Sequence, residues 1–343
     1  MPSSREQSPT KRRLAEDLTP RPSRKRTRTP DSRSSYSRLS QSQTTESSRK
    51  SGQISPQKHL KALERTGRGI LVRDIDGLSD HPSQQLASLL KEMRNVMRSR
   101  GILPQTARHE FENSKDRRIA ELGEDWTVFS AERDTLGHVP SQESVLALLR
   151  TARECHENFH SESSWNILVH SRLLGLALQL PDSECFPQFI DFLPCSSASI
   201  IPDYLLPLSP SKKVDFCICF NPSLETSPDI CAAIEAARGC LPGNAINHTG
   251  YYPLRKRPIA LSIETKMTGQ GWDSAALQLS VWQASHWNFL QELNDLALAK
   301  SAAHRVVWPD FLPCVMIQGH TWQLLITTRE ESRTPAAAEE LGS

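Results

Sequence analysis

The chain lacks a long apolar run, an apolar leader near Met1 and any C-x-x-C pair among its eight cysteines. A membrane-spanning helix needs about 20 consecutive apolar residues, so we expect no membrane span. Without an apolar leader we expect no secretory signal, and the thiols should be reduced and mostly buried rather than disulfide-bonded. A zinc site at Cys231, Cys240 and His248 would match none of the familiar ligand spacings.

The first 60 residues also lack aromatic side chains, apart from Tyr36. They carry 14 Lys or Arg against 5 Asp or Glu, together with 20 Ser or Thr. Such a segment cannot bury enough apolar surface to offset its conformational entropy, so residues 1–66 are predicted to form a disordered basic tail. Since the whole chain has 41 basic and 39 acidic residues, the remainder is net acidic.

Two basic clusters lie in this tail, ten residues apart: Lys11, Arg12, Arg13 and Arg24, Lys25, Arg26. Their spacing is typical of a bipartite nuclear import signal, which predicts importin as a partner and the nucleus as the location. The alternative is a solvated basic tail on a cytoplasmic protein. Four Ser-Pro or Thr-Pro pairs could be phosphorylated, and phosphate beside the clusters would weaken import or nucleic-acid contact. They begin at Ser8, Thr19, Thr29 and Ser55.

The rest of the chain alternates helical and strand patterns. Apolar spacing of three and four predicts helices over 83–99, 142–156, 162–179 and 272–299. Short apolar runs predict strands over 196–201, 213–220 and 258–264, and a hairpin over 312–330. This order indicates the α/β class. We expect a helical N-terminal extension over 67–140, a main domain over 141–330 with an insertion over 221–258, and a disordered C-terminus over 331–343.

Two of the predicted strands carry bulky apolar groups on one face and small or charged groups on the other, since strand side chains alternate. In the later strand one face has Ile259, Leu261, Ile263 and Thr265, and the other has Ala260, Ser262, Glu264 and Lys266. In the earlier strand Asp215 shares its face with Cys217 and Cys219. If the two strands pair, Asp215, Glu264 and Lys266 gather at one end of a shared face.

Such a gathering suits phosphoryl chemistry. Asp215 and Glu264 would repel each other unless a proton or cation lay between them. Mg²⁺ or Mn²⁺ fits, because a hard cation takes carboxylate oxygens and can polarise a phosphodiester and activate water. Lys266 could then stabilise the developing negative charge. The alternative is structural: a Glu264–Lys266 ion pair at a strand end, with Asp215 paired to Lys212 or Lys213.

Three stretches carry a family resemblance: "SKKVDFCICF", "SIETK" and "LQLSVWQASHW". With their neighbours over about 140–330, they resemble the PD-(D/E)XK nuclease superfamily, and more closely the fungal PD-(D/E)XK nuclease-like domain proteins. The resemblance implies a restriction-endonuclease-like mixed central sheet flanked by helices. It also implies metal-dependent hydrolysis of phosphodiester bonds in nucleic acid, with DNA as the expected substrate. Val214 stands where many members have proline.

The resemblance also assigns roles to residues. Asp215 and Glu264 would ligate Mg²⁺ or Mn²⁺, with the Thr265 carbonyl as a further ligand. Lys266 would be the catalytic lysine. Glu162 would match the family's upstream acidic residue and complete the metal site. The alternative for Glu162 is a helix N-terminal charge that the helix dipole favours.

Gln278 resembles the glutamine of the family's Q-x-x-x-Y helix element, which orients the site, although it could equally be a helix-surface residue. Trp165 and Trp282 are predicted to be core residues rather than platforms for stacked bases. The run "YYPLRKRP" sets tyrosines beside three cations that suit nucleic-acid binding, with a solvated basic loop as the alternative. Those cations are Arg255, Lys256 and Arg257.

A second function class stays open. A catalytically inactive nuclease-fold module could bind nucleic acid or regulate another protein without cutting a bond. The sequence leaves the oligomeric state unassigned. Cleavage assays with a divalent metal separate this class from an active nuclease.

Overall fold

The computed structural model describes most of the chain beyond the basic tail. The described residues are 55–64, 70–75, 83–136, 139–178, 189–207, 209–224, 228–269, 271–300, 307–329 and 334–340. The basic clusters at 11–13 and 24–26 and the first three phosphorylation candidates lie outside them. Within these ranges, no helix combines the length and apolarity that crossing a membrane requires.

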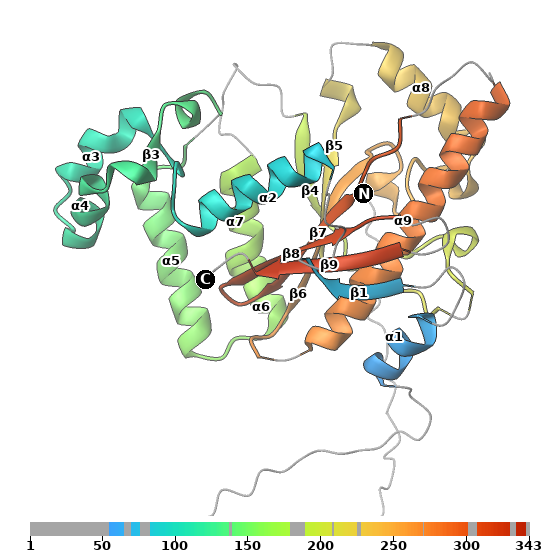
Figure 1. Ribbon diagram of the computed structural model, residues 1–343, viewed down its shortest axis with the longest axis horizontal. Coiled ribbons are helices and arrows are strands. Elements are labelled where there is room, and N and C mark those ends of the chain that lie inside the picture. The colour runs from blue at the N-terminus through green and yellow to red at the C-terminus, as the bar shows by residue number, and fades with distance from the viewer. Residues whose placement is uncertain are drawn as a thin grey trace, which may run out of the picture. The chain divides into compact units, whose positions relative to one another are not determined.

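A seven-stranded mixed sheet forms the centre of the fold, in the order β1-β9-β8-β7-β6-β5-β4 (Figure 1). The pairs β6–β7 and β1–β9 are parallel, and the other neighbours are antiparallel. This confirms the mixed α/β sheet that the resemblance implies. The strands are β1 Ile70–Asp74, β4 Ile190–Pro194, β5 Phe216–Phe220, β6 Ile259–Lys266, β7 Leu312–Gln318, β8 Thr321–Thr327 and β9 Thr334–Glu340.

The helices agree with the predicted periodicity to within a few residues. A π-helical turn over Asn166–His170 joins α6 to α7, so the predicted helix over 162–179 is continuous in the chain but changes its winding. A separate short pair, β2 (Leu103–Pro104) and β3 (Phe129–Ser130), lies outside the main sheet. The helices are α1 Pro56–Glu64, α2 Gln84–Met97, α3 Arg108–Glu112, α4 Arg117–Glu124, α5 Gln142–Glu157, α6 Glu162–Trp165, α7 Ser171–Leu178, α8 Pro228–Arg238 and α9 Trp272–Lys300.

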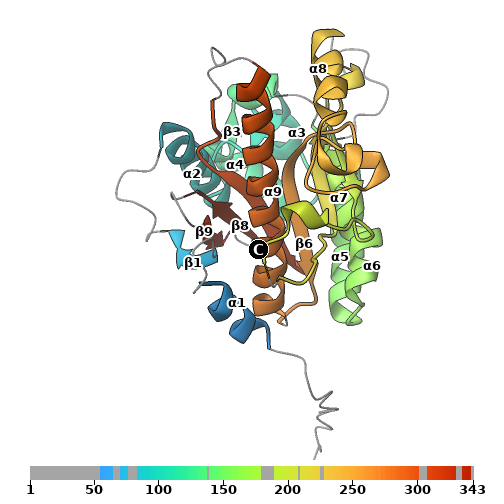
Figure 2. The same ribbon diagram turned by 90° about the vertical axis from the view of Figure 1, so that its right-hand side faces the viewer.

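Helices cover both faces of the sheet. Helix α9 lies on one side, with α1 packed on it, while α2 and α7 lie on the other (Figure 1). Seen from its own side in Figure 2, α9 crosses in front of the sheet. Its N-terminal half is buried almost all round, which agrees with its lack of an amphipathic pattern.

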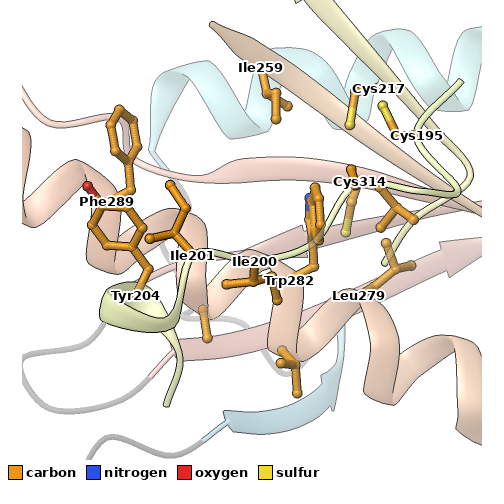
Figure 3. Close-up of a cluster of buried hydrophobic side chains, with 14 of the residues drawn as sticks. Cys195, Ile200, Ile201, Tyr204, Cys217, Ile259, Leu279, Trp282, Phe289 and Cys314 are labelled. Carbon is orange, nitrogen blue, oxygen red and sulfur yellow. The ribbon is translucent and has the colours of Figure 1, made fainter. Parts of the chain in front are cut away.

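The core under α9 is built around a tryptophan (Figure 3). Trp282 is fully buried, and its indole Nε1 donates a hydrogen bond to Ser262 Oγ of β6 at 2.9 Å. Cys217 of β5 and Cys314 of β7 pack in the same cluster as free thiols. With Trp165 also buried, the prediction that both tryptophans are core residues is confirmed.

Two predicted segments differ in the structure. The strand predicted over 196–201 is wrong: the strand is β4 at Ile190–Pro194. The apolar run at Ala198, Ile200 and Ile201 instead packs into the core cluster under α9. The apolar pattern therefore indicates that these residues are buried, not that they form a strand. The extension over 67–140, predicted to be helical, also contains strands: β1 joins the main sheet, and α2 packs on that sheet.

The chain ends were predicted to be disordered, yet both contribute elements. Residues 334–340, within the segment 331–343, form β9 between β8 and β1. An alanine-rich segment has low strand propensity, but two neighbouring strands can satisfy its backbone groups. At the other end, 56–64 forms α1, whose Leu60 and Leu63 are buried in the core. Two buried leucines in a polar segment were too weak a signal to predict this helix.

A β-bulge changes one predicted face. Cys219 pairs with Ile259 although Ile218 pairs with Leu261, so Ala260 is the extra residue. A bulge reverses the alternation beyond it. Ile259 therefore packs into the cluster under α9, whereas Ile263 lies in the cluster on the opposite face.

Candidate active site

The predicted catalytic residues meet where β6 ends and β5 begins. Phe216 pairs with Ile263, and the Asp215 amide donates a hydrogen bond to the Ile263 carbonyl at 3.0 Å. Because these strands are antiparallel neighbours, Asp215 lies beside Glu264 and Thr265. The pairing on which the sequence analysis depended is therefore present.

Thr265 holds the Asp215 carboxylate. Both its backbone amide and its hydroxyl donate to Asp215 Oδ2, at 2.9 and 2.8 Å. Thr265 is fully buried, so this contact is not exchanged with water. The family resemblance implies only a carbonyl ligand at Thr265. The positioning role of its hydroxyl was missed, because a threonine inside a strand usually indicates only strand propensity.

Glu264 is almost completely buried. Its Oε1 accepts hydrogen bonds from Lys266 Nζ and, at 2.6 Å, from Gln278 Nε2 of α9. Burial, reinforced by the nearby Asp215 carboxylate, raises the pKa of Glu264 to about 8, against the opposing effect of Lys266. The Glu264 carboxylate is thus held in place by hydrogen bonds, but the charge of Lys266 does not fully compensate its burial and the repulsion from Asp215.

Lys266 lies among the oxygens predicted to bind a metal ion. Its Nζ donates to Glu264 and to the Thr265 carbonyl at 2.8 Å, and lies 3.6 Å from Glu162 Oε2. Burial alone would lower the pKa of Lys266, but the carboxylates of Glu264, Glu162 and Asp215 together outweigh it, so the pKa lies above its ordinary value. The carboxylates of Glu264 and Glu162 thus share one ammonium group, and the nearby Asp215 adds a third negative charge, so the ionised cluster has an excess of negative charge.

Glu162 reaches this cluster from the first turn of α6. Ser161 caps that helix by accepting a hydrogen bond from the Ser164 amide at 3.3 Å. Burial raises the pKa of Glu162, partly offset by Lys266. The two interpretations of Glu162 therefore coexist: it occupies a favourable helix N-terminus and also faces Lys266.

Gln278 forms hydrogen bonds with three segments: β6, the residue Lys213 before β5, and its own helix α9. Besides Glu264, its Nε2 contacts the Lys213 carbonyl at 3.3 Å, and its Oε1 accepts from Ser274 Oγ at 3.3 Å. It is therefore not a simple surface residue. Ser274 was missed in the sequence, although its position four residues before Gln278 on the same helix face was a usable signal.

The oxygen atoms at this site are of the kind that a hard divalent cation binds. The Glu264 carboxylate, the Thr265 carbonyl and the Glu162 carboxylate already surround one cationic group, and all are oxygen donors of the kind Mg²⁺ takes. As the side chains stand, no group of three His, Cys, Asp or Glu residues within the described ranges is close enough to hold a metal ion. A bound ion would therefore need Lys266 to release Glu264 and the carbonyl.

The basic loop lies away from this cluster. Arg255, Lys256 and Arg257 precede β6, whereas Glu264 lies near its other end, about 20 Å away at the usual strand rise. Each has a partner: Arg255 lies over Tyr252, Lys256 pairs with Glu235 at 2.7 Å, and Arg257 with Asp191 at 3.0 Å. The structure does not bring these cations to the carboxylates.

Comparisons with known proteins agree with this geometry. A family model described as the PD-(D/E)XK nuclease superfamily matches residues 112–342, which is more than half of the chain. No curated protein matches the chain significantly. No solved structure does so either. The matched region extends beyond 141–330 at both ends and includes every residue of the cluster.

Proposed function

Because the chain belongs to the PD-(D/E)XK nuclease superfamily, we propose that it hydrolyses phosphodiester bonds of nucleic acid, with DNA as the expected substrate and Mg²⁺ or Mn²⁺ as cofactor. The observation that carries this proposal is the convergence of Asp215, Glu264 and Glu162 around Lys266 at the end of β6. Excess negative charge in a partly buried cluster costs stability, and groups with such shifted pKa values are found preferentially at sites of binding or catalysis.

Asp215, Glu264, Glu162 and the Thr265 carbonyl would hold the divalent ion. When bound, such an ion polarises the phosphodiester and lowers the pKa of a coordinated water. The positive charge would also offset the burial, and the repulsion from Asp215, that raise the pKa of Glu264.

The surrounding residues prepare the site. Thr265 orients Asp215 through two hydrogen bonds, and Gln278 orients Glu264 through one. Lys266, once free of the ligand oxygens, stabilises the negative charge that develops on the phosphoryl group. Preorganised donors of this kind avoid reorganisation during the reaction.

Binding of the polyanion needs a source of positive charge elsewhere. The chain beyond residue 60 is net acidic, whereas the first 60 residues carry 14 Lys or Arg against 5 Asp or Glu. We assign the tail a role in holding nucleic acid as well as in nuclear import. Affinity through such contacts falls steeply with salt.

Cleavage by the full-length protein with Mn²⁺ tests the proposal. Wild type should cut DNA, and Lys266→Ala should lose about 100-fold or more in rate while keeping its circular dichroism and melting temperature. Lys91→Ala, on the exposed part of α2, is the matched control and should cut normally. Wild type that cuts neither DNA nor RNA would instead favour an inactive nuclease-fold binding module.

A further inference from the structure

A cavity of about 500 Å³ opens at the start of α9, next to the carboxylate cluster. We propose that it binds an unstacked nucleobase of a single-stranded substrate, with Trp272 as the stacking platform. This inference rests on the proposed function, because it names the substrate form and a binding site for it. The volume lies in the range of ordinary small-ligand sites.

The cavity shares a wall with the proposed catalytic lysine. Gly271 lines it with φ +77°, and a Cβ added there would lie 3.0 Å from Lys266 Cδ. Gly269 also lines it with φ +74°, and an added Cβ would meet no atom within 4 Å. Gly271 therefore lies beside both the cavity and the Lys266 side chain. A nucleotide in the cavity would be adjacent to the phosphodiester at the cluster.

Trp272 has the properties of a stacking platform. Trp272 is 37% exposed, so part of its ring is accessible to a ligand. Its Nε1 donates to Gln323 Oε1 of β8 at 3.2 Å, which holds the indole in one orientation. A fixed aromatic ring loses little conformational freedom when a base stacks on it, and stacking tolerates any base.

The remaining lining suits a base better than a phosphate. Asp273, Ser274 and Gln318 supply carboxylate, hydroxyl and amide groups, and the described lining residues include no Lys, Arg or His. The Asp273 carboxylate already accepts a hydrogen bond from Gln57 of α1 at 2.8 Å, so a negative charge is fixed at this rim. Groups of these kinds can hydrogen-bond base edges, whereas a carboxylate repels phosphate.

A base can enter this cavity only if it is unpaired. Bases of a duplex are stacked and turned toward their partners, and removing one breaks both its stacking and its pairing. A single strand already has accessible base faces. The cavity beside Lys266 therefore favours cutting of single strands or of unpaired positions over intact duplex.

Binding in the presence of EDTA tests this without requiring cleavage. The probes are a fluorescent single-stranded oligodeoxythymidylate and the same strand with abasic positions, read by anisotropy on the full-length protein. Trp272→Ala should weaken binding of the thymidylate strand about tenfold, and Trp272→Phe should restore most of it. The abasic strand should bind wild type and Trp272→Ala equally. Trp126→Ala is the control, because Trp126 is 71% exposed but lies outside the cavity.

The outcomes separate this inference from the proposed function. Equal binding of the thymidylate strand by wild type and Trp272→Ala, an equal loss with the abasic strand, or no binding at all overturns the stacking site. If Trp272→Ala lowers the melting temperature, Trp272→Leu keeps an apolar side chain without a ring and should reproduce the loss. Absence of cleavage alongside Trp272-dependent binding would overturn the nuclease activity alone.

Discussion

Two sets of buried polar side chains pack against α9, and they differ in whether they have hydrogen-bond partners. At the start of the helix, Glu264 accepts two hydrogen bonds and lies beside other charges. Farther along, His248 is fully buried, and neither of its ring nitrogens has a partner among the described residues. It stacks on His286 with ring centroids 4.9 Å apart and meets the edge of Trp282 at 4.4 Å.

Burial shifts the pKa of an acidic side chain and that of a basic side chain in opposite directions. Burial raises the pKa of Glu264 to about 8 and lowers that of His286 to about 4. The histidines are therefore neutral rings that fill core volume. The carboxylate cluster is fixed by polar contacts and needs a cation to be ionised at low cost. We infer that the buried histidines serve packing and that the carboxylate cluster serves chemistry.

The largest expected effect is on metal binding. Asp215→Asn keeps an oxygen that can accept the hydrogen bonds from Thr265 but removes one negative charge from the cluster. We expect the affinity for Mn²⁺ to fall about 100-fold or more, measured by isothermal titration calorimetry, with cleavage lost in parallel.

His286→Phe provides the comparison, because it alters the second buried group and should leave Mn²⁺ affinity unchanged. If instead the histidine variant abolished metal binding, or Asp215→Asn left it intact, the assignment of the two groups would be reversed.

An intermediate effect is expected on stability against pH. The unfolded chain protonates histidine near pH 6.5, while the folded chain resists until about pH 4 at His286. Between these values the unfolded state binds more protons, so the free energy of unfolding falls as the pH drops. The loss from this residue should be about 2 kcal/mol between about pH 7 and pH 5.

Urea unfolding of wild type and His286→Phe at both pH values measures this term. The variant should lose less stability on acidification than wild type. Identical losses would mean that the ring of His286 is protonated in the folded core.

The smallest effect is expected at an exposed ion pair. Lys256 and Glu235 are 67% and 50% exposed at their side chains, and such pairs contribute little. Lys256→Ala should change the free energy of unfolding by less than about 0.5 kcal/mol and leave the cleavage rate unchanged. A clear drop in the salt dependence of DNA binding would instead give the basic loop a role in holding nucleic acid.

Much of the site could be predicted because strand alternation is local. Glu264 and Lys266 share a face through their own spacing, and the family resemblance pointed to Glu162 and Gln278. The role of the Thr265 hydroxyl could not be predicted, since it depends on Asp215 lying opposite it in the sheet. The position of Lys256 could not be predicted either, because Lys256 precedes the start of β6 whereas Glu264 lies near its end.

The sequence by itself determined the helices α2, α5 and α9, the strands β5 to β8, and which side chains of β6 share a face near its end, since these follow from the periodicity of neighbouring residues. Only the tertiary structure decided that β9 closes between β8 and β1, that a bulge turns Ile259 toward α9, and that the Thr265 hydroxyl meets Asp215. These features arise from pairing between segments far apart in the chain. No local pattern encodes such pairing.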